Sequence, residues 1–165
     1  AKRDQRKVVT YASQLALYDA VTRAMYYDKN AKPPKASTED ADFVSYLEVS
    51  TLGHFIEQEK PVVKIGFSVT GEDSKYVSTS DGDYLTEDSL IDLKTSKTKP
   101  SAKDTLQLLM YYLMGLHEDP KMYGKIKYLK IINPKLGKVY TYDLTDLSDE
   151  TKLQVERDVI DYDVG

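Results

Sequence analysis

The chain has 165 residues, of which 41% are hydrophobic and 30% charged, with a formal net charge of −4 and no cysteine. This composition is typical of a single globular domain with one hydrophobic core, and it excludes disordered, collagen-like and coiled-coil classes. The lack of cysteine excludes disulfides, thiolate metal sites and cysteine nucleophiles, and the longest strongly apolar run, Leu108 to Met114, is too short to cross a membrane. We therefore expect a cytoplasmic protein.

The first part of the chain is predicted to form two helices and a strand. Apolar residues recur at steps of three and four between Val8 and Tyr27, which is the spacing of one face of a helix. A second helix is expected from about Asp40 to Glu59, because Pro61 opposes its continuation. The β-rich run from Pro61 to Thr70 predicts a strand.

The rest of the chain is predicted to alternate strands with helices. Ser101 is a candidate helix cap, with Asp104 as the acid of a capping box, and Ser148 is a second candidate cap. The expected elements are a hairpin of residues 76–85 and 89–95, a helix over about 102–116, strands over 125–132 and 138–143, and a helix reaching about 162. This mixture predicts an α/β domain whose helices cover a mixed sheet.

Charge is unevenly distributed along the sequence. Residues 39–92 carry thirteen acidic and three basic side chains, whereas residues 93–142 carry ten lysines and three acidic side chains. A carboxylate cluster beside a cationic surface is the arrangement that a metal-dependent enzyme acting on a polyanion needs. Two solvated faces are the alternative, and charge alone favours that alternative.

Four side chains of the predicted hairpin could act together. If the turn is centred on residues 87–88, Asp83 lies opposite Asp92 and Asp81 lies opposite Lys94, and all four side chains project from one face of the sheet. Opposed carboxylates repel each other, so this arrangement needs a compensating cation. Because carboxylate and carbonyl oxygens are hard ligands, Mg²⁺ or Mn²⁺ is the expected ion.

Other polar residues admit both a functional and a structural interpretation. Lys94 could stabilise charge on a phosphate or orient a water, or it could form an ordinary salt bridge. Gln107 and Tyr111 lie four residues apart and share one helical face, either as part of a site or as a helix edge. Lys97 and Lys99 could neutralise phosphates near the start of the following helix, or could belong to a solvated loop.

In their order and approximate spacing, Asp83, Asp92-Leu-Lys94 and Gln107-Leu-Leu-Met-Tyr111 resemble the PD-(D/E)XK nuclease superfamily, particularly its RecB-like branch. The resemblance covers about residues 40–133. It implies a single domain over 1–165 with a restriction-endonuclease-like α-β-β-β-α-β core and a mixed sheet, extended by an N-terminal helix and by a C-terminal strand and helix.

The resemblance also implies roles for individual residues. Asp83, Asp92 and the backbone carbonyl of Leu93 would bind Mg²⁺ or Mn²⁺, and Lys94 would assist hydrolysis. The remaining implied roles are metal binding by Glu57, His54 or Asp81, and support of the site or nucleic-acid contact by Gln107, Tyr111, Lys97 and Lys99.

The expected function is that of a metal-dependent deoxyribonuclease that hydrolyses phosphodiester bonds, with nucleic acid as its partner and no membrane association. The alternative is a catalytically inactive nuclease-fold binding module, associated with a phage or with defence, that engages a protein partner through its acidic surfaces.

Overall fold

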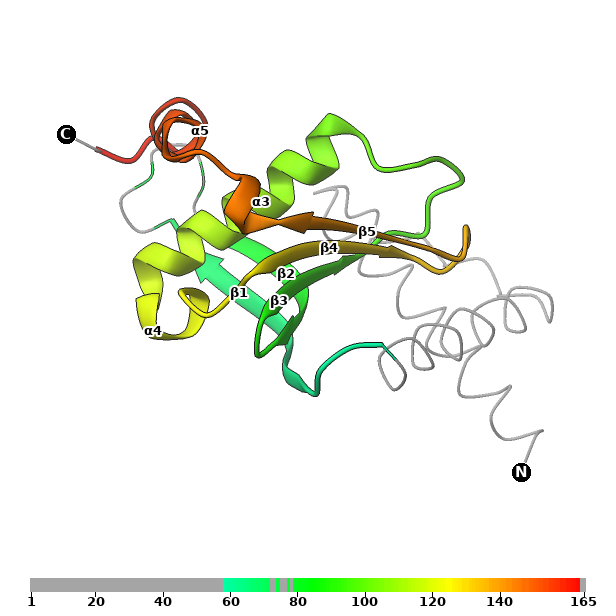
Figure 1. Cartoon of the computed structure of the whole chain (residues 1–165). Helices are drawn as coiled ribbons and strands as arrows, with labels where there is room; N and C mark the ends of the chain where they lie inside the picture. Colours follow the sequence, from blue (N-terminus) through cyan, green and yellow to red (C-terminus); the bar gives the residue numbers. More distant parts are fainter. Residues whose placement is uncertain (1–57, 72–73, 75–76, 78, 164–165) are drawn as a thin grey trace, which may run out of the picture. The chain divides into compact units, whose positions relative to one another are not determined.

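The computed structural model describes residues 58–71, 74, 77 and 79–163, drawn in colour in Figure 1. These residues belong to one compact unit, Gly53–Gly165. The predicted helix over 8–27, nearly all of the predicted helix over 40–59, and the candidate ligands His54 and Glu57 lie outside the described residues. The expectation of a single domain over the whole chain therefore stays a prediction.

A five-stranded mixed sheet forms the centre of the described residues, with strand order β1-β2-β3-β4-β5. The strands are β1 (Val62–Thr70), β2 (Thr79–Thr86), β3 (Ser89–Leu93), β4 (Tyr128–Asn133) and β5 (Lys138–Asp143). Neighbouring strands are antiparallel except for β3 and β4, which are parallel. A parallel pair needs a long crossover, and here that connection contains two helices. The prediction of an α/β fold with a mixed sheet is confirmed.

The longest helix of the described residues lies across one face of the sheet (Figure 1). The helical elements are α3 (Ala102–Glu118), α4 (Pro120–Tyr123), the 3₁₀ turn η1 (Leu144–Asp146), α5 (Asp149–Val155) and the π-helical turn η2 (Glu156–Ile160). The predicted capping box is confirmed, because Ser101 Oγ accepts a bond from the Asp104 amide while the Asp104 carboxylate accepts one, at 2.7 Å, from the Ser101 amide. Among the described helices, none combines the length and apolarity that a membrane crossing demands.

Several predicted elements have different boundaries in the structure, including the second strand of the hairpin, which ends at Leu93 rather than at residue 95. Residues 125–127 were expected in a strand, but β4 begins at Tyr128, after the short helix α4. This helix begins at Pro120, and the Asp119 carboxylate accepts a hydrogen bond from the Met122 amide at 3.0 Å. The terminal helix also changes to a π-helical turn at its end and stops at Asp161, whose φ is 70°.

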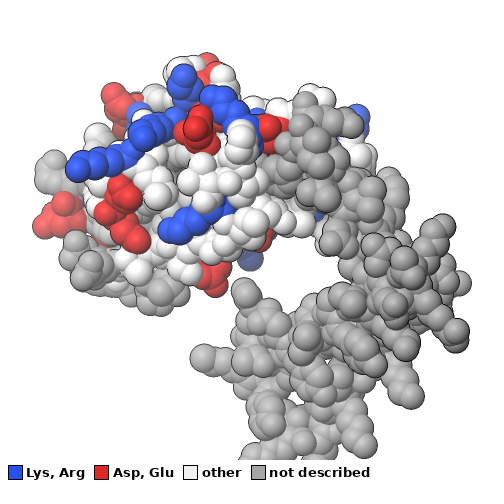
Figure 2. Space-filling view, turned by 90° about the horizontal axis from the view of Figure 1, so that it is seen from below, with Lys and Arg blue, Asp and Glu red and all other residues white. Residues whose placement is uncertain are grey.

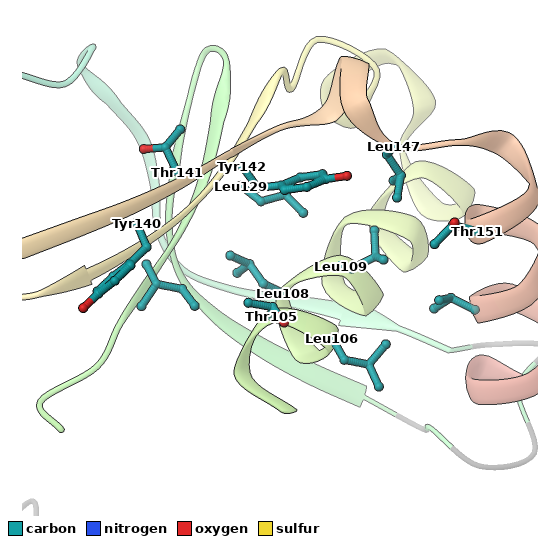
Figure 3. Close-up of a pocket in the computed structure, with 12 residues that line it drawn as sticks. Thr105, Leu106, Leu108, Leu109, Leu129, Tyr140, Thr141, Tyr142, Leu147 and Thr151 are labelled. Atoms are coloured by element: carbon teal, nitrogen blue, oxygen red, sulfur yellow. The ribbon is translucent and has the colours of Figure 1, made fainter. Parts of the chain in front are cut away.

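The hydrophobic core lies between α3 and the sheet. The buried members from the strands and from α3 include Phe67, Val69, Leu85, Leu90, Leu108, Leu113, Met114, Leu129 and Ile131. Beside this core, α3, β4, β5 and α5 enclose an apolar cavity of about 500 Å³ (Figure 3). Its wall combines leucine, isoleucine and valine side chains with three threonines and two tyrosines.

The hairpin of β2 and β3 has the predicted register, with Tyr84 opposite Ile91 and Leu85 opposite Leu90. The regular alternation of side chains is nevertheless interrupted within β2. Gly82 lies against the ring of Phe67 in the core under α3, and Leu85, three residues later, belongs to the same core. Strict alternation would place these two positions on opposite faces of the sheet.

A glycine on the neighbouring strand accounts for this interruption. In β1, Ile65 is 74% exposed whereas Phe67 is buried, and Gly66 between them has a φ of 60°. That left-handed conformation departs from extended geometry and changes the alternation of faces. Since Ile65 lies opposite Tyr84 and Phe67 opposite Gly82, the irregularity falls beside Asp83.

We expect Gly66→Ala to destabilise the protein by about 1–2 kcal/mol, because a side chain at this backbone conformation is strained even though the space around it is open. Gly66→Asn should be milder, since asparagine tolerates the left-handed region. Urea denaturation of both variants and the parent chain measures the effect. Equal stability of the alanine variant and the parent would contradict the prediction.

Candidate functional site

An ion pair between a buried carboxylate and a half-buried lysine lies at the carboxyl end of β3. Asp92 is only 8% exposed, and its Oδ2 lies 3.1 Å from Nζ of Lys94. The Lys94 amide donates to the carbonyl of Ile132 at 2.9 Å, so the backbone of the lysine is fixed against β4. The parallel pairing of β3 with β4 thus positions the ammonium group beside the carboxylate.

Helix α3 holds the lysine from the other side. Nζ of Lys94 donates to Oε1 of Gln107 at 3.1 Å, and Nε2 of Gln107 donates to the hydroxyl oxygen of Tyr111 at 2.6 Å. The two helical residues are four apart, which places them on one face of α3. Because the amide donates to the tyrosine through nitrogen, its oxygen faces the lysine. The structure therefore joins Asp92, Lys94, Gln107 and Tyr111 in one polar chain.

Asp83 is fixed directly onto β3. Its Oδ2 accepts a hydrogen bond of 2.7 Å from the Leu93 amide, between Asp92 and Lys94 in sequence. The negative charge of Asp83 also contributes to raising the pKa of Asp92. The two carboxylates therefore lie close enough to interact electrostatically, which the predicted opposition of these residues requires.

Asp81 has a different environment from the one expected. It is exposed, and its Oδ1 accepts a hydrogen bond of 2.8 Å from Oγ of Ser68 in β1. The pairing of β2 with β3 ends at Tyr84 and Ile91, and Lys94 contacts Asp92 and Gln107 instead of Asp81. The expected opposition of Asp81 and Lys94 is therefore not formed, because β2 loses its regular alternation near Asp83.

Burial dominates the electrostatics of the site. The pKa of Asp92 is raised, first by burial and then by the charges of Asp83 and Asp104, while Lys94 acts in the opposite direction. Burial and the charge of Asp92 likewise raise the pKa of Tyr111. A carboxylate that is costly to ionise in its own site is stabilised by any additional cation placed beside it.

The oxygen atoms of Asp83, Asp92 and the Leu93 carbonyl are the type of ligand that a hard divalent cation prefers. Among the described residues, none gives the buried Oδ2 of Asp92 a well-directed hydrogen bond, and Lys94 faces it as an ion pair. Within the same residues, no group of three histidine or carboxylate side chains converges on one point. Asp83, Asp92 and the Leu93 carbonyl remain the predicted ligands, and any contribution of Glu57 or His54 lies outside the described residues.

The two predicted phosphate contacts lie outside the polar chain. Lys97 and Lys99 are both exposed in the loop between β3 and α3. Within that loop, Ser96 Oγ accepts a hydrogen bond of 2.9 Å from the Thr98 amide, which gives the backbone a defined turn. These lysines are therefore placed on the surface beside the ion pair of Asp92 and Lys94, and their predicted role stays a prediction.

Sequence interpretation missed a buried residue next to the site. Asn133, at the end of β4, is fully buried, and its Nδ2 donates to the carbonyl of Ser96 at 3.0 Å. Its Oδ1 accepts a bond of 3.2 Å from the Leu136 amide in the connection to β5. The Asn133-Pro134 pair is a turn signal in the sequence, but nothing in that signal identifies the loop that the side chain reaches.

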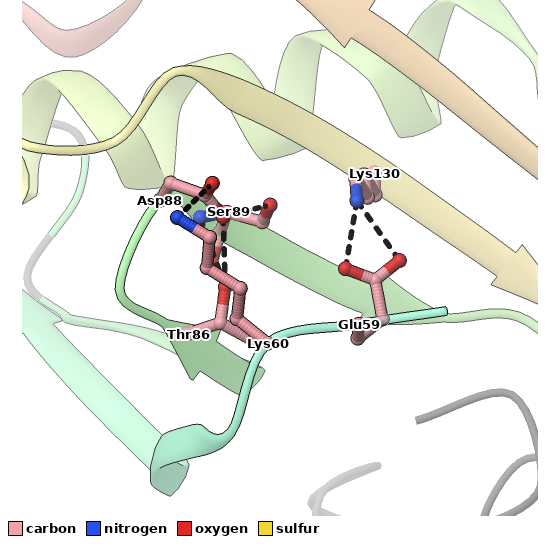
Figure 4. Close-up of polar contacts among 6 residues, drawn as sticks. All are labelled: Glu59, Lys60, Thr86, Asp88, Ser89 and Lys130. Carbon is pink, nitrogen blue, oxygen red and sulfur yellow. Dashed lines mark hydrogen bonds and ion pairs between the residues drawn. The ribbon is translucent and has the colours of Figure 1, made fainter. Parts of the chain in front are cut away.

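Two further ion pairs fix the segment that precedes β1 (Figure 4). Both oxygens of Glu59 accept bonds from Nζ of Lys130, at 2.9 and 2.7 Å. Nζ of Lys60 lies 2.9 Å from Oδ2 of Asp88 in the turn between β2 and β3. Their partners are far apart in the chain, so no local pattern predicts them.

Comparison with known proteins gives no relative for this chain. No protein-family profile, no curated protein and no solved structure matches it.

We expect Asp92→Asn to raise the free energy of unfolding at neutral pH by about 0.5–2 kcal/mol in metal-free buffer. Because the pKa of Asp92 is raised above 3.8 in the folded state, the folded chain binds this proton more tightly than the unfolded chain. The contribution of Asp92 to stability therefore falls as the pH rises from 3.8, the value in the unfolded chain, through the raised pKa of the folded chain. At neutral pH the ionised Asp92 lowers the free energy of unfolding.

Urea denaturation in EDTA between about pH 4 and 7 measures this effect, and the gain should shrink as the pH is lowered. Asp146→Asn removes an exposed carboxylate and serves as the matched control, with no comparable gain expected. A destabilised Asp92→Asn variant at neutral pH would show that the ion pair with Lys94 outweighs the cost of burial.

Proposed function

We propose that the protein is a Mg²⁺- or Mn²⁺-dependent nuclease with a restriction-endonuclease-like core, and that it hydrolyses phosphodiester bonds in DNA. The observation that carries this proposal is the buried Asp92 carboxylate, which lies beside Asp83 and is paired with a lysine held by α3. The order of three strands, a helix and a further strand, with β3 and β4 parallel, supports the proposed core.

The residues that would hold the ion are Asp83, Asp92 and the carbonyl of Leu93. When bound, a divalent ion would neutralise phosphate charge and lower the pKa of a coordinated water. The protein contributes the fixed orientation of these oxygens. The Asp83 bond to the Leu93 amide holds one carboxylate against the strand that carries the other.

In this proposal, Lys94 acts on the substrate. An ammonium group has three hydrogens; Gln107 accepts a bond from one of them, and Asp92 faces the group as an ion pair. A remaining hydrogen can point to a phosphate oxygen or to the attacking water, where the positive charge stabilises the charge that develops in the transition state. Gln107 and Tyr111 are positioning residues in this scheme, since they touch the lysine rather than the substrate.

We expect the wild-type protein to cleave DNA in the presence of Mn²⁺, and Asp92→Asn and Lys94→Ala each to lower the rate by at least about 10²–10³. Gln107→Leu should lower it by about 10–100-fold, because the lysine loses its orienting partner. Lys121→Ala, which removes an exposed lysine of α4, is the matched control and should retain the rate.

The assay follows a labelled duplex, a single strand and a branched substrate on gels, with circular dichroism to show that each variant is folded. Cleavage at the same specific activity in Asp92→Asn and Lys94→Ala would assign the activity to another site or to a contaminant.

Calorimetric titration with Mn²⁺ separates a nuclease from an inactive binding module. We expect the wild type to bind the ion, and Asp83→Ala to lose at least about tenfold in affinity. Asp146→Ala, which removes an exposed carboxylate, should bind as the wild type does. A wild-type protein that takes up no Mn²⁺ would contradict the proposed nuclease and favour the inactive module.

A further inference from the structure

Two loops lie side by side at the end of the sheet that carries the candidate site. One is the loop from β3 to α3, and the other is the connection from β4 to β5 (Figure 1). Asn133 joins them, since its side chain donates to Ser96 in the first loop and accepts from Leu136 in the second. Because Asn133 is fully buried, this link fixes the two loops relative to each other.

The two loops have the same charge. Residues 94–103 and 133–138, which are the two loops with the adjoining ends of α3, β4 and β5, together contain six lysines and no acidic residue, and Asp104 follows in α3. Apart from Lys94, all of these lysines are exposed: Lys97, Lys99, Lys103, Lys135 and Lys138. Lysines from two segments far apart in the sequence are thereby placed at one edge of the molecule, next to the ion pair of Asp92 and Lys94.

We propose that these two loops form one binding surface for the phosphate backbone of nucleic acid, with Lys135 and Lys138 of the β4–β5 hairpin extending the contacts of Lys97 and Lys99. The inference rests on the proposed function, which makes nucleic acid the substrate of the adjacent site. It adds the hairpin lysines and Asn133, the residue that positions them, to the residues that recognise the substrate.

Ammonium groups on flexible side chains suit a phosphate backbone, because they neutralise charge without reading a sequence and release condensed counterions. The amino end of α3 lies in the same region, and the helix dipole adds a favourable field for anions there. A surface of this kind holds the strand while Lys94 and the carboxylates act on one phosphodiester bond.

Lysines at the opposite end of the sheet are a weaker candidate. A groove between the β2–β3 turn and α4 is lined by Lys60, Lys121, Lys125 and Lys127, but also by Glu87, Asp88 and Asp119. Lys60 is paired with Asp88 at 2.9 Å. In the view from below, basic and acidic side chains are likewise interspersed (Figure 2). Neighbouring carboxylates repel a polyanion, and this groove has three of them against four lysines, whereas Asp104 is the acidic residue that follows the lysines of the first loop.

The test is equilibrium binding of a fluorescent DNA duplex, followed by anisotropy at several salt concentrations in EDTA, where metal-dependent hydrolysis does not occur. The hairpin variant is Lys135→Gln with Lys138→Gln, and the loop variant is Lys97→Gln with Lys99→Gln. The matched control is Lys121→Gln with Lys125→Gln, which removes the same charge from two exposed lysines near α4.

We expect the slope of log affinity against log salt to become shallower by about 1 for each lysine neutralised in the hairpin and in the loop, with no such change in the control. The proposal is overturned if the wild type does not bind, if the hairpin variant keeps the wild-type slope, or if the control loses as much as the hairpin variant. Polyglutamate that competes as well as unlabelled duplex would also overturn it, because the surface would then accept any polyanion, including an acidic protein.

The outcomes for binding and for cleavage are separable. If the protein binds DNA through these lysines but does not cleave it with Mn²⁺, the proposed binding surface is supported and the proposed nuclease activity is contradicted. If the protein cleaves DNA but the hairpin variant binds DNA with unchanged affinity, the proposed nuclease activity is supported and the proposed binding surface is contradicted.

Discussion

Burial of the Asp92 carboxylate is the constraint around which the site is organised. A charge removed from water is costly unless a cation and oriented dipoles replace the lost solvation. Lys94 supplies the cation, at 3.1 Å, but Gln107 also shares its ammonium group. The raised pKa of Asp92 shows that this compensation is incomplete. The carboxylate is therefore held in an environment that favours any further positive charge.

The topology of the sheet makes that burial possible. The parallel pairing of β3 with β4 aligns their carboxyl ends, so that Lys94 is bonded to Ile132 and Asn133 can reach Ser96. The connection between these strands has to return across the sheet as a helix, and that helix carries Gln107 over the end of β3. The same backbone arrangement thus places the amide against the lysine and the two lysine-bearing loops against each other.

Local signals in the sequence predicted the parts of this arrangement that depend on neighbouring residues. The hairpin register and the capping box at Ser101 are examples, because turn residues and cap residues act within a few positions. The irregular alternation at Asp83 was not predictable, since it arises from the left-handed Gly66 on another strand. The pairing of Glu59 with Lys130 and the reach of Asn133 depend on tertiary contacts over long sequence separations, and no periodicity encodes them.

The irregularity at Asp83 also has a consequence for the chemistry. In a regular ladder, Asp81 and Asp83 would be equivalent positions on one face, and both would face β3. In the structure Asp81 is bonded to Ser68 on the outer strand, whereas Asp83 is bonded to the Leu93 amide beside Asp92. The change of alternation therefore distinguishes two carboxylates that the sequence leaves equivalent. One carboxylate of β2 therefore lies beside Asp92, and the repulsion that, after burial, raises the pKa of Asp92 comes from Asp83 together with Asp104 of α3.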